Sequence, residues 1–349
     1  MARKTLTTKP NTRDDDATTV LLDALPPLDV GGSVLVVGDR TGRVAPDLRN
    51  RSLEVTLWNR RAQANRPGTP WPAPGPYDAA VVRLPRIKAE LEMTIHAVAA
   101  QLRPGAPLYV YGANDEGIKS APSRMEPLLG EVVSIDARKH CRVVEALRPE
   151  ELPGLKQSLD DFKSSLTLDL PEGPVEHASY PGVFAKGQLD PGTAALLEAL
   201  PPISPKVRLL DFACGAGVIG GSLKRRRPEI QVWMTDIDAV SVEAAKQNVP
   251  EAQVACGDRW AAVQAIRHFH LIVSNPPIHT GKGRDYSILT DLAEGAPMRM
   301  RDKGQLWIVV QRQVPADVAL KEVFSRVTMA WQDTRYRVWC AENPIKKRR

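Results

Sequence analysis

Cysteine is scarce and scattered in this chain. The 349 residues include four, Cys141, Cys214, Cys256 and Cys340, and none lies near another in the sequence. Structural zinc sites and disulfide-rich folds need closely paired cysteines, so this distribution argues against both. We therefore expect no bound metal and a protein of the reducing cytoplasm.

Long apolar runs are also missing. No run approaches the roughly 20 residues needed to cross a bilayer, and the polar start Met1-Ala2-Arg3-Lys4 does not lead into the apolar core of a signal peptide. These absences favour a cytoplasmic protein with no membrane contact. With 349 residues, 43% hydrophobic and 25% charged, the chain is large enough for two domains of ordinary size.

Charge is plentiful but uneven along the chain, whose net charge is +6. Residues 1–170 hold 23 basic and 22 acidic side chains, whereas residues 171–349 hold 24 and 19. Basic clusters such as residues 224–227 and the tail 346–349 suit a polyanionic partner. Solvated helix faces and tails have the same composition, so charge alone leaves a nucleic-acid partner open.

Short apolar segments alternate with helical patterns in both halves, which predicts parallel sheets with crossover helices. The predicted strands cover residues 33–38, 53–58, 77–82, 107–111, 207–212, 231–235, 254–256, 270–274, 306–310 and 335–340. The predicted helices cover residues 18–25, 88–102, 238–248, 288–300 and 318–324, with Gly304 in the exit turn of the fourth.

The two halves of the chain resemble each other. Residues 34–42 align with 209–217, and residues 77–85 align with 269–277. This predicts an α/β protein of two tandem Rossmann-like domains that arose by duplication. The first copy is degenerate, since it has Asn59 where the second has Asp236, and Arg83-Leu84-Pro85 where the second has Asn275-Pro276-Pro277.

The predicted organisation follows from these patterns and from composition. In chain order it consists of a disordered tail (1–18), a degenerate domain for RNA binding or support (19–150), a connecting region (151–178), a catalytic domain (179–342) and a basic tail (343–349).

Asn275-Pro276-Pro277 follows a strand predicted to be buried. Proline cannot continue a central strand and fixes its own φ, so the Asn275 amide sits on a stiff turn at the carboxyl end of the strand. Ligands of open α/β sheets bind at that end. A rigid acceptor there suits chemistry on an exocyclic amino group, although a plain strand-ending turn would have the same sequence.

Acidic residues end the three preceding strands. Asp211 precedes the glycine turn Ala213-Cys214-Gly215-Ala216-Gly217, and Asp236 and Asp258 follow in turn. Asp211 would repel a pyrophosphate but suits a sulfonium and an α-amino group, which argues against the dinucleotide that Gly217 and Gly220 alone would allow. Asp236 is placed for ribose hydroxyls, and Asp258 for an adenine amino group.

These motifs resemble the class I S-adenosylmethionine-dependent methyltransferases that modify amino groups. Residues 180–192 are similar to a more selective signature, found before the cofactor domain of bacterial small-subunit (16S) rRNA guanine-N2 methyltransferases. The resemblance implies S-adenosylmethionine as cofactor and a lid of Phe184, Leu189 and Asp190. The cofactor site it implies comprises Phe184, Leu189, Asp190, Asp211, Ala213, Cys214, Gly215, Gly217, Asp236, Ile237, Asp258, Arg259 and Asn275.

The same resemblance implies methyl transfer to guanine N2, with Asn275, Pro276 and Pro277 as catalytic residues. The family usually has an aromatic residue after the prolines, whereas this chain has Ile278 and His279, which become the candidates for holding the base. Ribosomal RNA, within the 30S subunit or an assembly intermediate, is the implied partner of a monomeric enzyme.

Several alternatives stay open on sequence alone. The large-subunit (23S) rRNA guanine-N2 enzymes share every motif named, and Asn-Pro-Pro also serves protein-glutamine and adenine-N6 methyltransferases. A non-catalytic rRNA-binding assembly factor belongs to a different class, but damage would then be expected at Asp211, Asp236 or Asn275, and all three are present.

Overall fold

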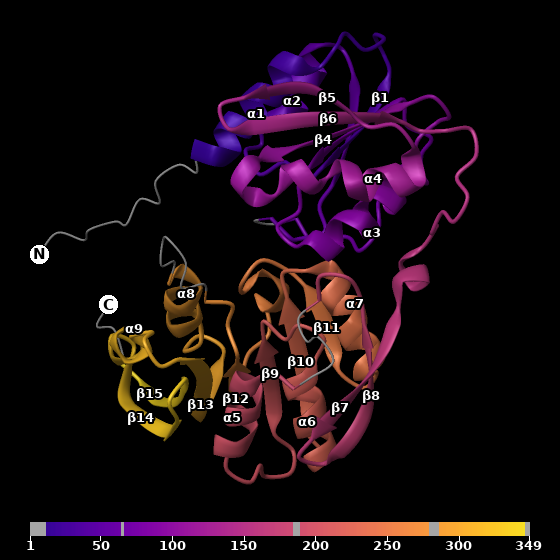
Figure 1. Ribbon diagram of the computed structural model, residues 1–349. Coiled ribbons are helices and arrows are strands. Elements are labelled where there is room, and N and C mark those ends of the chain that lie inside the picture. Colours follow the sequence, from indigo (N-terminus) through magenta and orange to yellow (C-terminus); the bar gives the residue numbers. More distant parts are fainter. Residues whose placement is uncertain (1–11, 64–65, 184–188, 279–285, 346–349) are drawn as a thin grey trace, which may run out of the picture. The chain divides into compact units, whose positions relative to one another are not determined.

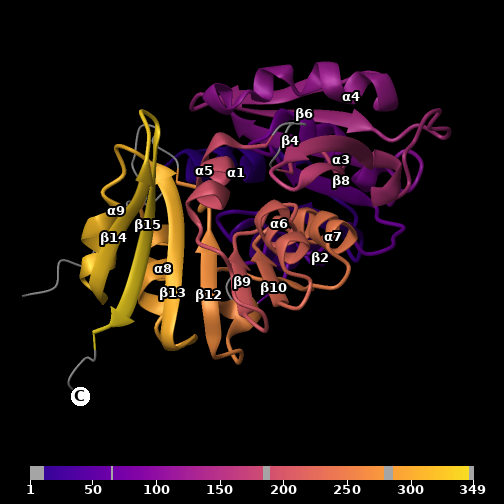
Figure 2. The ribbon, with the colours of Figure 1, turned by 90° about the horizontal axis from the view of Figure 1, so that it is seen from below.

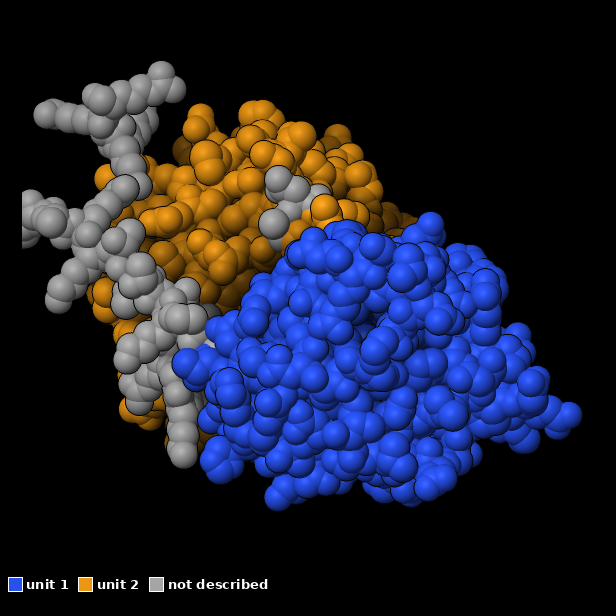
Figure 3. Space-filling model, turned by 90° about the horizontal axis from the view of Figure 1, so that it is seen from above, with its two compact units in different colours: residues 1–59, 71–162 blue, residues 60–70, 163–349 orange. Residues whose placement is uncertain are grey.

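The computed structural model describes residues 12–63, 66–183, 189–278 and 286–345 (Figure 1). The chain divides into two compact units, unit 1 with residues 1–59 and 71–162, and unit 2 with residues 60–70 and 163–349 (Figure 3). Within the described ranges, no helix is both long and apolar enough to span a membrane.

Unit 1 contains a mixed sheet with the strand order β2-β1-β3-β4-β6-β5, in which β1 to β4 are parallel and β5 and β6 run antiparallel at one edge. Its helices and strands are α1 (Thr12–Ala24), β1 (Ser33–Val37), α2 (Val44–Asn50), β2 (Glu54–Trp58), β3 (Ala79–Arg83), α3 (Lys88–Ala99), β4 (Pro107–Ala113), α4 (Pro122–Leu129), β5 (Val133–Arg138) and β6 (Cys141–Leu147).

Alternating residues of the unit 1 strands face two cores. Leu35 and Val82 pack on one face in a cluster with residues of α3 and α4. Val36 and Val81 pack on the other, in a cluster with residues of α1 and α2. Strands buried on both faces read as continuous apolar runs, which is why the sequence revealed them.

Unit 2 contains a sheet with the order β11-β10-β9-β12-β13-β15-β14, parallel except at β15 and β14, and a separate hairpin of β7 and β8. Its helices and strands are β7 (Ser164–Leu170), β8 (Gly173–Ser179), α5 (Pro191–Ala199), β9 (Arg208–Phe212), α6 (Val218–Arg226), β10 (Gln231–Asp236), α7 (Ala239–Asn248), β11 (Gln253–Cys256), β12 (Phe269–Ser274), α8 (Ser287–Gly295), β13 (Met300–Gln311), α9 (Ala316–Lys321), β14 (Phe324–Gln332) and β15 (Tyr336–Pro344).

Figure 2 shows the central sheet of unit 2 between two layers of helices. Leu209 and Val273 face a cluster that includes residues of α5, α6 and α7. Leu210 and Ile272 face the opposite cluster, which includes residues of α8 and α9. The apolar strands are thus covered on both sides, and ligands have access at the strand ends.

The two strand orders confirm the predicted duplication. In chain order, β1 to β6 correspond to β9, β10, β12, β13, β14 and β15, and both sheets then have the same arrangement. Unit 2 adds α7 and β11, which lie between β10 and β12 in the sequence. In unit 1, the corresponding connection from β2 to β3 contains residues 60–70, which belong to unit 2.

Several predicted boundaries were wrong. Residues 12–18 belong to α1 rather than to a disordered tail, because Asp14 is buried and paired with Arg83. The predicted connecting region holds the hairpin of β7 and β8. The helix predicted to reach residue 300 ends at Gly295, and Gly304 lies inside β13, where a Cβ atom would approach the Phe269 carbonyl oxygen to 2.9 Å.

Candidate functional site

The predicted site residues come together at one edge of the unit 2 sheet. Strands β10, β9 and β12 are parallel neighbours, and Asp211 lies in register with Met234 on one side and Val273 on the other. Their carboxyl ends therefore meet at the same edge, which is where such sheets bind ligands. Buried Ser274 ties two of the ends together by donating a 2.7 Å hydrogen bond to the Phe212 carbonyl oxygen.

Asp211 is fully buried at this edge. Its Oδ2 accepts a 2.8 Å hydrogen bond from the Gly220 amide, while Oδ1 has no partner among the described residues. Burial, together with the nearby charge of Asp236, raises the pKa of Asp211 to about 7. A buried acceptor without a donor is costly, so this carboxylate suits a donor that arrives with a ligand.

The turn after β9 is shaped by residues in left-handed backbone conformations. Ala213 has φ 58° and Gly217 has φ 83°. Such a conformation costs a non-glycine residue about 1–3 kcal/mol and is concentrated at functional sites. The turn is held against the next strand, because the Cys214 amide donates to the Thr235 carbonyl oxygen.

Asp236 is the centre of the neighbouring loop. Its Oδ2 accepts a 2.8 Å hydrogen bond from the Gly215 amide, and its Oδ1 accepts a 2.9 Å bond from the Asp238 amide. Burial raises the pKa of Asp236 to about 6. Each oxygen keeps a second lone pair, so the carboxylate is oriented and can still accept from ligand hydroxyls.

The remaining predicted cofactor residues lie at neighbouring positions of the same edge. Ile237 is 39% exposed next to Asp236. Asp258 follows β11, and Arg259 adopts φ 52° and forms an ion pair with Asp291. The structure thus places Asp236 beside the glycine turn and Asp258 after the neighbouring strand, and the ligand contacts of both stay predictions.

The Asn275 amide is held in one orientation. Its Nδ2 donates to Asp190 Oδ2 at 2.7 Å and to Thr193 Oγ1 at 3.1 Å. A carboxylate can only accept, so Asp190 fixes which end of the amide is nitrogen. The Asn275 Oδ1 is left as an acceptor, and no described residue donates to it. The neighbouring Pro276 carbonyl oxygen accepts from the Ile278 amide at 2.8 Å and has a second lone pair.

Asp190 is the N-cap of α5, and its Oδ2 also accepts from the Thr193 amide at 2.8 Å. A Cβ atom on Gly192 would lie 3.1 Å from Asp190 Oδ2 and 3.4 Å from Asn275 Nδ2, so a glycine lets the helix start close to the Asn275 turn. Leu189 precedes this cap. Phe184, the other predicted lid residue, lies outside the described residues.

The residues predicted to hold the base are only partly described. Pro277 is exposed, and Ile278 is partly buried against the cluster on the α8 and α9 face. His279 lies outside the described ranges. Tyr286 packs against the same cluster as Ile278, and its hydroxyl is buried with no hydrogen-bond partner in the described part of the chain.

Sequence reasoning missed Thr193, Ser274 and Arg60. Thr193 directly follows the signature of residues 180–192, and Ser274 directly precedes Asn275, so the local sequence could have indicated both. Arg60 had no local signal, because its partner is 178 residues away. Its Nε donates to both Asp238 carboxylate oxygens at 2.7 and 3.0 Å.

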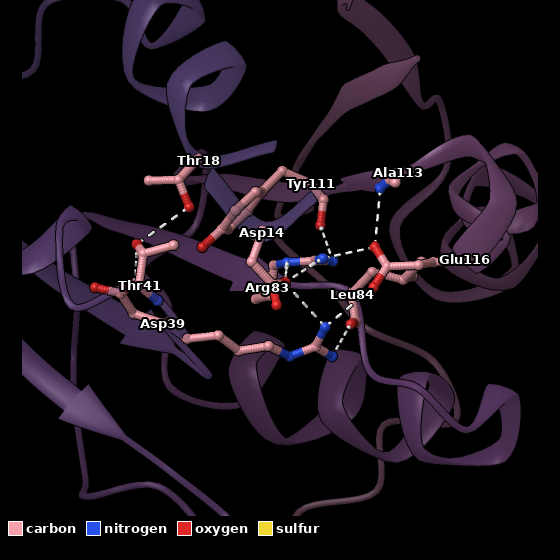
Figure 4. A network of polar contacts seen from close by, with 10 residues as sticks. Asp14, Thr18, Asp39, Thr41, Arg83, Leu84, Tyr111, Ala113 and Glu116 are labelled. Atoms are coloured by element: carbon pink, nitrogen blue, oxygen red, sulfur yellow. Dashed lines mark hydrogen bonds and ion pairs between the residues drawn. The ribbon is translucent and has the colours of Figure 1, made fainter. Parts of the chain in front are cut away.

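Unit 1 has an ion-pair network at the corresponding position (Figure 4). Arg83, where unit 2 has Asn275, donates to Asp14 Oδ1 at 2.6 Å and to Glu116 Oε2 at 2.5 Å. Arg40, in the turn after β1, donates to Asp14 Oδ1 and Glu116 Oε1, both at 3.2 Å, and to the Leu84 carbonyl oxygen at 2.9 Å. Two cations and two anions therefore lie at the position in unit 1 that corresponds to the Asn275 turn of unit 2.

Comparison with known proteins agrees with this geometry. The methyltransferase small domain matches residues 175–340, and the corresponding N-terminal domain matches residues 30–158. A solved structure of the T. thermophilus 16S rRNA N2 G1207 methyltransferase in complex with AdoMet and guanosine has a TM-score of 0.81 and 25% identity, over 94% of this chain and 92% of that one. The predicted pair of Rossmann-like methyltransferase domains is therefore confirmed.

Two curated relatives carry the same name. The ribosomal RNA small subunit methyltransferase C of Stutzerimonas stutzeri is 37% identical over 68% of this chain and 71% of its own length. That of Shewanella amazonensis is 32% identical over 78% and 79%. The predicted family resemblance is confirmed, and the chain belongs to the ribosomal RNA small subunit methyltransferase C family.

Proposed function

We propose that this protein transfers a methyl group from S-adenosylmethionine to the exocyclic N2 amine of a guanosine in 16S rRNA. The observation that carries the proposal is the fixed Asn275 amide, whose nitrogen is held by Asp190 and Thr193 and whose oxygen is left to accept. The T. thermophilus structure, a complex with AdoMet and guanosine, is that of a 16S rRNA N2 G1207 methyltransferase.

The described residues fit the cofactor. Asp211, with its unpartnered buried Oδ1, would bind the positively charged amino acid end. Asp236 would accept from the ribose hydroxyls, and Ile237 and Asp258 would face the adenine. When bound, S-adenosylmethionine supplies an activated methyl group on a sulfonium.

Asn275 and Pro276 would act on the nucleophile. The lone pair of guanine N2 is delocalised into the ring, which makes the amine a poor nucleophile. The Asn275 Oδ1 and the Pro276 carbonyl oxygen accept its two N–H bonds and direct the lone pair towards the methyl group. One N–H proton becomes acidic as the methyl group is transferred and passes to water. Catalysis then rests on positioning and electrostatics and requires no base with a shifted pKa.

The base has to leave its stack to reach this turn. Ile278 supplies an aliphatic surface where the family usually has an aromatic residue. Tyr286 packs against the same cluster and has an unpartnered hydroxyl, which makes it a further candidate for holding the guanine.

The natural substrate would be 16S rRNA in the 30S subunit or in an assembly intermediate. The enzyme would act on it in the cytoplasm as a monomer. The curated relatives are named for the small subunit, which makes 23S rRNA the less favoured substrate. The intact Asp211, Asp236 and Asn275 favour an enzyme over an assembly factor.

The test is methylation in vitro followed by mass spectrometry of the RNA nucleosides. Purified protein and labelled S-adenosylmethionine are mixed with bare 16S rRNA, 30S subunits or 23S rRNA, each prepared without the modification. We expect N2-methylguanosine in a small-subunit substrate, and none with Asn275→Ala. Transfer to 23S rRNA alone, or to adenine, would contradict the proposal.

A further inference from the structure

The segment of residues 60–70, which we call the strap, belongs to unit 2 although the chain on both sides of it belongs to unit 1. It directly follows Asn59 at the end of the degenerate copy's second strand. In unit 2 the corresponding stretch forms α7 and β11. The strap therefore stands in the sequence where the degenerate copy lacks a helix and a strand.

The strap pairs with the loop that carries Asp236. The Ala62 amide donates to the Ile237 carbonyl oxygen at 2.8 Å, and the Ala239 amide donates to the Arg60 carbonyl oxygen at 3.0 Å. These two bonds flank Asp238 and form an antiparallel bridge with the strap. The loop is thus held along its backbone on both sides of the residue that caps α7.

Arg60 adds a buried ion pair to this bridge. The side chains of Arg60 and Asp238 are 6% and 8% exposed. The Arg60 Nη1 also donates to the Pro181 carbonyl oxygen at 2.8 Å, three residues before Phe184. The Arg60 guanidinium therefore binds both the loop that carries Asp236 and the segment that precedes the predicted lid residue Phe184.

Asp238 passes this constraint to the cofactor site. Its amide donates to Asp236 Oδ1, and its own Oδ1 accepts from the Val240 amide at the start of α7. We propose that Arg60 is a positioning residue for cofactor binding: through Asp238 it holds the Asp236 carboxylate in the geometry that two ribose hydroxyls require. The inference rests on the proposed function, and it gives the strap a part in the cofactor affinity of unit 2.

The test compares Arg60→Met and Arg60→Lys with Arg83→Met in the full-length protein. Arg83 is an equally buried, ion-paired arginine, but its partners lie in unit 1. Calorimetry measures the dissociation constant for S-adenosylmethionine, thermal melts measure stability, and hydrogen exchange follows the amides of residues 236–242 without cofactor.

We expect Arg60→Met to raise the dissociation constant roughly 5- to 150-fold, the usual range of coupling between linked sites. Exchange at residues 236–242 should accelerate, kcat should change little, and Arg60→Lys should recover part of the affinity. Arg83→Met should lower the melting temperature and leave affinity and loop exchange unchanged. If Arg60→Met only lowers the melting temperature, the positioning role is wrong. Failure of the wild type to methylate RNA would instead contradict the proposed function.

A separate observation concerns the amino-terminal edge of the unit 2 sheet. Six cations lie there, near the starts of β9, β12 and β13, and one of them, Arg299, is buried: Lys206, Arg208, Arg267, Arg299, Arg301 and Lys303. Asp302 is the only acidic residue in the stretches 206–208, 267–270 and 299–303. The net charge of these stretches is therefore +5, whereas that of the whole chain is +6. None of the six has a carboxylate within 4.0 Å among the described residues.

Two of the arginines contact neutral groups instead. The Arg208 guanidinium lies 4.7 Å from the Trp233 ring centroid, and Arg301 Nη1 lies 2.6 Å from His270 Nε2. A hollow of about 510 Å³ lies beside them, lined in part by Arg208, Trp233 and Arg267. Unneutralised arginines that line an open hollow suit phosphate oxygens.

We infer that this amino edge binds the phosphate backbone of the substrate RNA. It lies at the ends of the strands opposite Asp211 and Asn275, so the RNA it holds is remote from the target nucleotide. The inference presupposes the proposed RNA substrate, and it assigns the amino edge an additional contact that increases affinity without selecting the base.

The test uses two triple variants with the same loss of charge. Arg267→Ala/Arg301→Ala/Lys303→Ala removes unpaired cations of the amino edge. Lys246→Ala/Lys321→Ala/Arg326→Ala removes three exposed cations of unit 2 that already pair with Glu243, Asp317 and Glu342. The dissociation constant for a 16S rRNA transcript is measured against salt concentration, with S-adenosylmethionine affinity as a check on folding.

Each lost phosphate contact should reduce the salt slope by about 0.7–0.9. We expect the amino-edge variant to lose about 2 in slope and the control less than 1, with cofactor affinity unchanged in both. Equal losses in the two variants, or none in the first, would overturn the inference. Wild-type protein that binds the transcript but does not methylate it would count against the proposed function alone.

Discussion

The carboxyl ends of two corresponding strands, β12 in unit 2 and β3 in unit 1, carry different side chains with different partners. In unit 2, an acidic residue at the start of α5, Asp190, holds the neutral amide of Asn275. In unit 1, an acidic residue near the start of α1, Asp14, holds the guanidinium of Arg83. The two helices precede corresponding strands, so this acid–partner pair is an element that both copies retain.

The difference lies in what the partner leaves available. Asn275 spends its nitrogen on Asp190 and keeps an oxygen that can accept. Arg83 has donors only, and they are occupied by Asp14 and Glu116. Unit 1 therefore has a closed ion-pair network where unit 2 has Asn275, and the Arg83 side chain offers no acceptor to an amino group.

The largest effect should come from removing the unit 2 acceptor. Asn275→Ala is expected to lower the rate of methyl transfer by about 100- to 1000-fold, the 2.7–4 kcal/mol typical of one preorganised electrostatic contact. Cofactor affinity should be nearly unchanged. Single-turnover methylation, with calorimetry and a thermal melt on the same sample, measures all three. Full activity in a folded variant would remove Asn275 from the mechanism.

Asn275→Asp would keep an acceptor at this position but would add a negative charge. The new carboxylate would face Asp190 Oδ2, at the 2.7 Å now bridged by a hydrogen bond. We therefore expect Asn275→Asp to transfer methyl groups no faster than Asn275→Ala.

Arg83→Met should have the next largest effect, and on stability rather than on cofactor binding. The Arg83 side chain is 1% exposed, and its loss leaves Asp14 and Glu116 only partly compensated by Arg40. A broken buried pair costs about 3–5 kcal/mol, and we expect the lower end. Chemical denaturation measures the loss, with Arg138→Met, an exposed pair, as a control expected below about 1 kcal/mol.

Asp236→Ala removes the acid of unit 2 that unit 1 replaces with Asn59. The loss of charge-assisted bonds to ribose hydroxyls, each worth about 1.5–3 kcal/mol, should weaken cofactor binding far more than RNA binding. The reciprocal change, Asn59→Asp, should create no cofactor site in unit 1, because Arg40 and Arg83 still occupy its edge. Micromolar cofactor binding gained through Asn59→Asp would contradict the network's role.

The sequence predicted what depends on local pattern and left out what depends on distant partners. Buried parallel strands read as apolar runs, and strand-end residues such as Asp211 and Asn275 follow directly from them. The clamp of Asp190 on Asn275 joins residues 85 apart, and the ion pair of Arg60 with Asp238 joins residues 178 apart. The local pattern of apolar and polar residues around them reveals neither contact.

The smallest effects should appear as opposite responses of the two units to pH. Burial raises the pKa of Asp211 to about 7 and that of Asp236 to about 6. In unit 1, burial also opposes ionisation of Asp14 and Glu116, but Arg83 and Arg40 lower both pKa values. The acids of unit 2 thus bind protons more tightly in the folded state than in the unfolded state, and those of unit 1 more weakly.

The sign follows from linkage between protonation and folding. As pH falls from about 7 towards 4, Asp211 and Asp236 take up protons in the folded state first, so unit 2 without cofactor should gain stability. The contribution of Asp14 and Glu116 to stability is complete above their unfolded pKa values and is lost only as pH falls through their lowered folded pKa values.

Binding of a cationic cofactor needs ionised Asp211, so its affinity should fall about tenfold between pH 8 and pH 6. Calorimetry across this range tests the affinity, and hydrogen exchange resolved by unit tests the stability. Asp211→Asn is the control, since it should remove most of the pH dependence of binding, and an unchanged dependence in that variant would assign the titration to another group.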